Sequence, residues 1–300
     1  RNMTETILIT GASGFLGKRM VRFLQRTSDA YLLTTSRQQE SFPNHLVRDL
    51  SDATSELTDK VDTVIHFAGL GAHNSGGEED FHNANVTMTL QVAKAAMESN
   101  VKRFIFISTT DVYGADSQSP LVESSSLKPK SAYARSKLVA EDALKELYKD
   151  SEMNLIILRL PLIYHIDAVN EFGQYVKMVK ENRPLPLDKI NNQRTLLALC
   201  NFESALNALL HQPEIRNETM NIADNISLST TEMMNGIAVA AVVPIKLFYA
   251  PKLIAKASLK LAGKTQFFEK FWGDFQVSSE YAQQRLQWQP SDSYVVNLSK

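Results

Sequence analysis

The sequence has few cysteines and little excess charge, and each shortage excludes a class of protein. Cys200 is the only cysteine among 300 residues, so the chain cannot form an internal disulfide, which suits a reducing compartment. The formal net charge of -1 gives no field that would favour nucleic acid or an acidic membrane surface. No apolar run reaches the roughly 18 residues that a membrane-spanning helix needs. These shortages predict a cytoplasmic protein with no nucleic-acid and no membrane partner.

The start of the sequence also lacks a targeting pattern. It runs almost directly into the strand-like segment Glu5–Thr10, so no signal peptide is predicted. The 44% hydrophobic and 22% charged residues are ordinary for a globular protein, so the chain can bury a core. No metal site is predicted.

Short apolar segments alternate with helical patterns, and this alternation predicts the fold class. The segments have no polar face, which is typical of parallel strands that are buried on both sides. Helical patterns lie between them, notably over 84–98 and 131–149. Repeated alternation of this kind predicts an α/β fold with a doubly wound parallel sheet. The expected strands are Glu5–Thr10, Tyr31–Thr35, Asp62–Ala68, Arg103–Ser108 and Asn154–Leu160.

A glycine-rich turn follows the first expected strand and opens a helix. Glycine has no Cβ, so its backbone can turn sharply and approach a pyrophosphate closely. The helix N-terminus offers free N–H groups and a positive dipole end to that anion. The motif alone is weak, but it stands between a strand and a helix, as a dinucleotide site requires. The residues expected to bind the cofactor here are Gly11, Ser13, Gly14, Phe15, Leu16 and Gly17.

The end of the second expected strand bears on the choice of cofactor. Sites for NAD usually place a carboxylate there to hold the ribose 2′-hydroxyl. This chain has Ser36 and Arg37 instead, a hydroxyl donor and a fork that suit a 2′-phosphate. The alternative is that Arg37 is a solvated surface residue. The pair favours NADP over NAD.

A second group of residues predicts chemistry at the same edge of the sheet. Tyr133 and Lys137 are four residues apart in a helical pattern and therefore share a face. A phenol with a pKa of about 10 is a poor acid or base, and a nearby ammonium would favour its ionised form. Ser108, Thr109 and Thr110 directly follow a strand, where a hydroxyl can bind a reacting oxygen or merely form a turn.

In their order and spacing, these residues resemble the extended short-chain dehydrogenase/reductases, the NAD-dependent epimerase/dehydratase family. The resemblance covers nearly the whole chain and implies a Rossmann-type sheet. It implies that Tyr133 is the acid/base, that Lys137 holds the nicotinamide ribose and tunes Tyr133, and that Thr109 binds the reacting oxygen. It also implies further cofactor contacts from Asp49, Leu50, Phe67, Ala68, Gly69, Asn85, Ser108, Leu160, Pro161 and Ile163.

The second half of the chain is similar to bacterial UDP-sugar 4-epimerases and 4-keto-reductases of surface-polysaccharide synthesis. The matching segments are 182–187, 192–195, 224–231 and 285–290. The resemblance implies that Arg194 meets a diphosphate, and it places Lys270 where relatives often carry Arg. It departs at His165, where Gly is usual, and at Glu171, a carboxylate that would repel a diphosphate unless it points away.

These observations predict a dinucleotide-binding domain over 3–165, to which segments around 194–224 return, and a smaller substrate-binding lobe over 166–300. The predicted function is hydride transfer at C4 of a UDP sugar, by a 4-keto-reductase or a 4-epimerase. NADPH-dependent reduction of a small non-sugar carbonyl compound, or cofactor sensing without catalysis, are the alternatives. The resemblance also implies a homodimer through the helices at 84–98 and 131–149.

Overall fold

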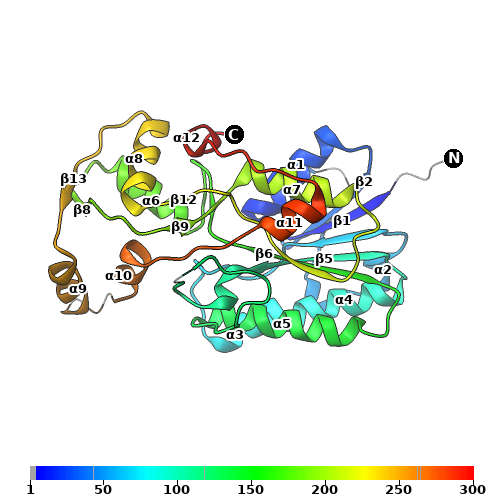
Figure 1. The fold of residues 1–300 in the computed structure, drawn as a ribbon. Helices are drawn as coiled ribbons and strands as arrows, with labels where there is room; N and C mark the ends of the chain where they lie inside the picture. The colour runs from blue at the N-terminus through cyan, green and yellow to red at the C-terminus, as the bar shows by residue number, and fades with distance from the viewer. Residues whose placement is uncertain (1–4, 43, 118, 262, 264) are drawn as a thin grey trace. The chain divides into compact units, whose positions relative to one another are not determined.

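In the computed structural model, which describes residues 5–42, 44–117, 119–261, 263 and 265–300, the apolar segments form one seven-stranded sheet (Figure 1). Its order is β11-β6-β5-β4-β1-β2-β3. After β3 the chain crosses to the other half of the sheet, so the strand order reverses between the neighbouring strands β1 and β4. The pairs β1–β2, β1–β4, β2–β3 and β4–β5 are parallel. The predicted doubly wound Rossmann-type sheet is confirmed. Its strands are β1 (Thr6–Thr10), β2 (Tyr31–Ser36), β3 (His45–Val47), β4 (Thr63–His66), β5 (Arg103–Thr109), β6 (Asn154–Leu160) and β11 (Glu218–Asn221).

The chain divides into two compact units. The first comprises residues up to Val112, Pro129–Arg159 and Leu209–Met220, and it contains the large sheet. The second comprises Tyr113–Lys128, Leu160–Ala208 and the residues from Asn221 onward.

Helices cover both faces of the large sheet, with α1 on one side and α4 and α5 on the other (Figure 1). Leu8, Val64 and Phe104 point from the strands toward α4 and α5, where they meet Val92 and Leu144. The expected helix over 84–98 begins earlier, in α3, and passes through a π-helical turn. The helices of this unit are α1 (Phe15–Thr27), α2 (Ser55–Thr58), α3 (Glu78–His82), the π-helical turn Asn83–Thr87, α4 (Met88–Glu98) and α5 (Ala132–Tyr148).

The second unit consists of small two-stranded sheets and helices. The strand pairs are β7–β10, β8–β13 and β9–β12. Its strands are β7 (Ile163–Tyr164), β8 (Leu185–Asp188), β9 (Arg194–Thr195), β10 (Leu197–Ala198), β12 (Ser227–Leu228) and β13 (Leu247–Tyr249). Its helices are α6 (Glu171–Lys180), α8 (Thr230–Ala241), α9 (Lys252–Leu261), α10 (Thr265–Trp272), α11 (Glu280–Leu286) and α12 (Tyr294–Asn297), while α7 (Leu199–Leu210) joins the units in sequence.

Of the range 194–224 that is predicted to return to the first domain, the part that begins at Arg194 does not join the large sheet. Strand β9 pairs antiparallel with β12, so its backbone groups are already used in the second unit. Strand β11, which lies inside the predicted range 194–224, does join the large sheet. None of the helices in the described ranges has the length and apolar character that a membrane crossing requires.

Candidate functional site

The glycine-rich turn after β1 leaves no room for side chains. Gly11 has φ +68°, and a Cβ there would lie 2.6 Å from the Ala68 backbone nitrogen at the end of β4. A Cβ on Gly17 would lie 2.2 Å from the Gly11 carbonyl oxygen. Helix α1 starts after Gly14, and its first turn has no acidic residue to offset the dipole. Its free N–H groups therefore suit the pyrophosphate of a dinucleotide.

The ends of β2 and β3 bring the predicted adenosine-side residues together. Arg37 is exposed, and its charge helps to hold the pKa of Asp49 below its usual range, after the hydrogen bonds from Ser51. Ser36 is buried, and its hydroxyl donates to the Gln38 carbonyl at 2.7 Å. Only Arg37 of the Ser36–Arg37 pair is therefore free to meet a 2′-phosphate. Leu50 is buried beneath this edge.

The predicted residues after β4 form a loop held by Asn85. The Asn85 side chain accepts a hydrogen bond from the Leu70 N–H at 2.8 Å and donates to the Leu70 carbonyl at 3.1 Å. It also donates to the Ser136 hydroxyl on α5 at 2.9 Å. Asn85 is fully buried in the π-helical turn, so in this structure it holds the loop that carries Phe67, Ala68 and Gly69.

The predicted catalytic residues meet at the carboxyl end of β5. Helix α5 begins at a Ser131 cap that accepts from the Ala134 N–H at 3.0 Å, and this sets the first turn that carries Tyr133. Tyr133 and Thr109 share a hydrogen bond between their side chains. Lys137, one turn further along α5, donates to the Ile107 carbonyl at 2.9 Å. The structure therefore brings Thr109, Tyr133 and Lys137 together.

The electrostatics of this group differ from the expectation that the ammonium lowers the phenol's pKa. The pKa of Tyr133 lies above its ordinary value, mainly because the phenol is buried and also because Asp111 is negatively charged. The hydrogen bond with Thr109 acts in the opposite direction. Burial lowers the pKa of Lys137 to about 8, against the effect of the Glu141 carboxylate. Tyr133 is therefore a neutral proton donor at neutral pH.

Thr110, which was predicted to contact substrate, is placed differently from Thr109. It is fully buried, and its hydroxyl has no hydrogen-bond partner within the described part of the chain. A substrate group cannot reach it in this conformation.

Beneath the site lies a buried ion pair that our sequence reasoning missed. The Glu141 carboxylate on α5 accepts hydrogen bonds from the Ser108 hydroxyl at 2.5 Å and from the Arg159 Nη2 at 2.6 Å. Glu141 and Arg159 are 0% and 2% exposed. Two signals could have found them: Glu141 follows Tyr133 and Lys137 at the same four-residue spacing, and Arg159 is a lone charge in an apolar strand. The pair fixes α5 against β5 and β6, and it occupies the hydroxyl of Ser108, a predicted cofactor contact.

His66 is part of the scaffold rather than an accessible acid or base. Its two ring nitrogens contact the hydroxyls of Thr10 at 2.8 Å and Thr89 at 2.9 Å. Burial, with a further effect from Lys137, lowers its pKa to about 3. His66 therefore stays neutral and joins β1, β4 and α4.

This burial predicts a pH dependence of stability. The folded pKa of His66, about 3, is below the ordinary 6.5, so the unfolded chain binds the proton more readily. The stability that depends on neutral His66 is fully present above pH ~6.5 and falls by up to ~1.4 kcal/mol per pH unit as acid is added toward pH 3. Urea unfolding at several pH values in this range should show that the free energy of unfolding depends less steeply on pH for His66→Gln than for the wild type. Equal slopes would contradict the assignment.

In the second unit, the predicted substrate residues are already engaged. Lys270 forms an ion pair with Glu171 at 2.6 Å, and the Tyr175 hydroxyl also donates to Glu171. Arg194 donates to the Gly273 carbonyl at 3.4 Å and lies 5.9 Å from the Phe275 ring centre. Glu171, a departure from the resemblance, is thus neutralised within its own unit.

The remaining predicted contacts follow β6. Leu160, Pro161 and Ile163 are buried, and they belong to the second unit. His165, the other departure, is buried too, and its Nδ1 accepts from the Asp167 N–H at 3.0 Å.

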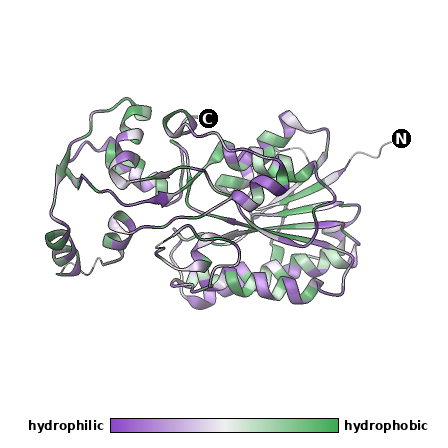
Figure 2. Ribbon diagram, in the orientation of Figure 1, coloured by the Kyte–Doolittle hydropathy of each residue, from purple (hydrophilic) through white to green (hydrophobic). Residues whose placement is uncertain are grey.

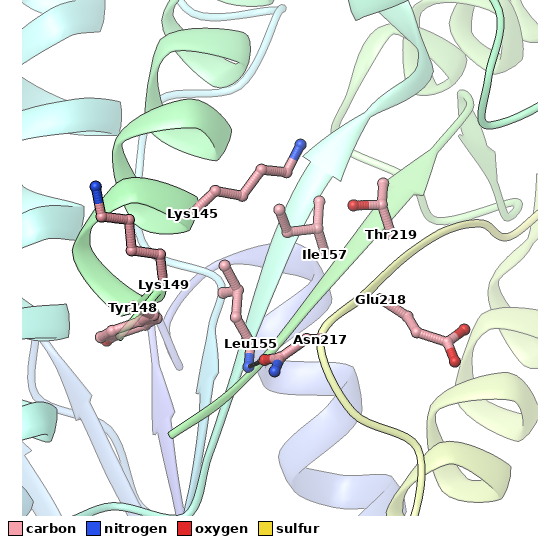
Figure 3. Close-up of a pocket in the computed structure, with 8 residues that line it drawn as sticks. All are labelled: Lys145, Tyr148, Lys149, Leu155, Ile157, Asn217, Glu218 and Thr219. Atoms are coloured by element: carbon pink, nitrogen blue, oxygen red, sulfur yellow. Dashed lines mark hydrogen bonds between the residues drawn. The ribbon is translucent and has the colours of Figure 1, made fainter. Parts of the chain in front are cut away.

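A surface hollow of about 240 Å³ lies elsewhere on the first unit. Lys145 and Tyr148 of α5 and the following Lys149 line one side, and Leu155 and Asn217 lie opposite (Figure 3). Lys145 lies twelve positions after Tyr133 on α5, which is roughly 18 Å along a helix. The hollow is therefore separate from the predicted catalytic residues.

Residues 7–223 match the NAD dependent epimerase/dehydratase family. The chain belongs to this family. Among curated members, a UDP-glucose 4-epimerase of Vibrio cholerae is 29% identical over 97% of this chain and 92% of its own length. The low-salt glycan biosynthesis protein Agl12 of Haloferax volcanii is 26% identical over 75% of this chain and 79% of its own. The extended short-chain dehydrogenase/reductase resemblance is thereby confirmed.

Solved structures in this family share the fold. The UDP-glucuronic acid 4-epimerase of Bacillus cereus in complex with NAD has a TM-score of 0.79 at 20% identity, covering 98% of this chain and 96% of that one. MoeE5 in complex with UDP-glucose and NAD has a TM-score of 0.79 at 18% identity, covering 98% and 96%. At these identities the likeness shows the fold alone.

Proposed function

We propose that this family member transfers hydride at C4 of a UDP sugar, as a 4-epimerase. The observation that carries the proposal is the hydrogen bond between Tyr133 and Thr109 beside Lys137 at the carboxyl end of β5. The name of the Vibrio cholerae relative, which aligns over most of both chains, supports the choice of epimerisation. The alternative is a 4-keto-reductase that consumes NADPH.

The cofactor site is proposed to be the segment from Gly11 to Gly17, where close backbone contacts exclude a Cβ at these two glycines and the start of α1 offers N–H groups to a pyrophosphate. A bound nicotinamide would accept a hydride from the sugar and return it. Tyr133 is the neutral phenol without ligands, so it would first lose its own proton to water; the positive charges of Lys137 and of a bound oxidised nicotinamide would favour this phenolate. The phenolate would take the proton of the C4 hydroxyl and give it back when the ketone is reduced. Thr109 would hold the same oxygen, and Lys137 would hold the nicotinamide ribose and position Tyr133. Arg194 would meet the diphosphate, with Lys270 beside it.

The purified protein should be incubated with NAD⁺ or with NADP⁺, in each case together with UDP-glucose, UDP-N-acetylglucosamine or UDP-glucuronic acid in turn. An epimerase converts one of them to its C4 isomer without net change in the nicotinamide absorbance. A reductase instead consumes NADPH with a UDP-linked 4-keto sugar. Turnover only with small non-sugar carbonyl compounds, or cofactor binding with no turnover at all, would overturn the proposal.

The cofactor preference is a separate proposal, NADP(H) over NAD(H), and it rests on Arg37. Arg37→Ala should weaken NADPH binding by about 1.5–3 kcal/mol, the value of a hydrogen bond to a charged group, and leave NADH binding unchanged. Arg26→Ala, in the last turn of α1, is the control. Calorimetric titration of both cofactors decides the matter: an equal loss for NADH and NADPH means that Arg37 does not read the 2′-phosphate. The homodimer through α4 and α5 stays a prediction for sedimentation analysis.

A further inference from the structure

One stretch of the second unit has charge of a single sign. Between Glu232 and Glu269 the sequence contains no Asp or Glu. The same stretch contains Lys246, Lys252, Lys256, Lys260 and Lys264. The net charge of -1 for the whole chain hides this segregation. Charges farther apart than about 10 Å are screened at ordinary salt, so a partner at this surface meets the local excess of lysine.

Helix α9, inside this stretch, has an apolar stripe that faces away from the protein. Ala255 is buried and Leu259 is half-buried, so these two positions mark the packed side. On the other side, Leu253 is 83% exposed, Ile254 61% and Leu261 91%. These large apolar side chains contribute little to the free energy of folding, because they remain in contact with water.

The lysines of α9 form a row beside this stripe. Lys252, Lys256 and Lys260 recur every four residues, and the apolar row Leu253, Ala257 and Leu261 follows each of them by one position, about 100° around the helix. Lys256 also lies over the Phe268 ring of α10 at 5.7 Å. Figure 2 shows hydrophobic and hydrophilic colouring side by side on α9.

We propose that α9 docks on the surface of a membrane that contains anionic lipid. The apolar stripe enters the boundary between headgroups and acyl chains, and the lysine row lies among the acidic headgroups. A protein partner would explain the stripe, but three lysines at four-residue spacing, in a stretch of sequence without Asp or Glu, fit an anionic lipid surface better. The helix lies on the membrane and does not cross it. This inference is independent of the catalytic assignment, and it amends the expectation of no membrane partner that net charge suggested.

The test is co-sedimentation of the full chain with vesicles of phosphatidylcholine alone or mixed with phosphatidylglycerol. The protein should bind the mixed vesicles, bind the neutral ones far less, and release as salt is raised. Replacing Lys252, Lys256 and Lys260 together by Gln should lower the partition coefficient roughly a hundredfold. Leu253→Ser and Leu261→Ser should each lower it roughly tenfold or more.

Matched controls test whether the effect depends on where the replaced residues lie or only on their chemical type. Replacing the exposed Lys60, Lys128 and Lys180 by Gln changes the net charge equally, and Val169→Ser removes an apolar side chain that is 67% exposed. Both controls should bind like the wild type, and circular dichroism should show that every variant is folded. No binding to the mixed vesicles, or equal losses in the controls, would overturn the proposal. The proposal would also be overturned if the wild type formed oligomers but did not bind vesicles, and Leu253→Ser dissociated those oligomers, because the stripe would then bind a second copy.

Discussion

Replacing Tyr133 by Phe is expected to lower turnover by about 10²–10⁴-fold while the cofactor still binds. Loss of a positioned acid has this magnitude, because the oxygen that gains charge in the transition state loses its proton donor. The side-chain hydrogen bond between Tyr133 and Thr109 places the two hydroxyls side by side. Steady-state kinetics on the best UDP sugar, with cofactor binding followed by fluorescence, measures both effects.

Tyr148→Phe is the matched control. Tyr148 lies on the same helix and donates to the Ala93 carbonyl at 2.8 Å, away from Thr109. Its loss should leave turnover unchanged. Thr109→Ser should also be tolerated because the hydroxyl remains, whereas Thr109→Val should not, and Lys137→Ala should weaken cofactor binding as well as turnover. If Tyr133→Phe kept most of its activity, the acid would have to be sought at Asp111, since buried His66 is neutral and inaccessible.

Replacing Glu141 by Ala is expected to lower the free energy of unfolding by about 3–5 kcal/mol. The change leaves the guanidinium of Arg159 buried without its carboxylate, and an uncompensated buried charge has a cost of this size. Such a loss is a large part of the roughly 5–15 kcal/mol that stabilises a typical domain. Urea or thermal unfolding of the purified variant measures it.

The control for this prediction stands on the same helix. Glu146 pairs with Lys149, but both side chains are exposed, at 72% and 56%. Glu146→Ala should therefore cost no more than ~1 kcal/mol. Replacing Glu141 and Arg159 together by Leu should restore much of the stability, because no unpaired charge remains. If Glu141→Ala were as mild as Glu146→Ala, the buried pair would not fix α5 to the sheet.

The sequence by itself determined the parts of this protein that depend on short-range pattern. Continuous apolar segments between helical patterns are typical of strands in a sheet covered on both faces, so the large sheet and five of its seven strands could be predicted. Gly11 and Gly17 could be assigned because no other residue fits a turn of that kind between a strand and a helix. Tyr133 and Lys137 could be paired because the spacing of a helix places them on one face.

Only the tertiary structure decided what depends on contacts distant in sequence. The end of β9 binds β12 rather than the large sheet, because the antiparallel pairing uses its backbone groups. Ser108 and Asn85, which stay predicted cofactor contacts, form hydrogen bonds in this structure with Glu141 and with the Leu70 backbone, which the sequence did not indicate. The pKa of Tyr133 is raised, since burial and Asp111 outweigh its hydrogen bond. These outcomes come from desolvation and from partners far along the chain, and neither has a fixed spacing in the sequence.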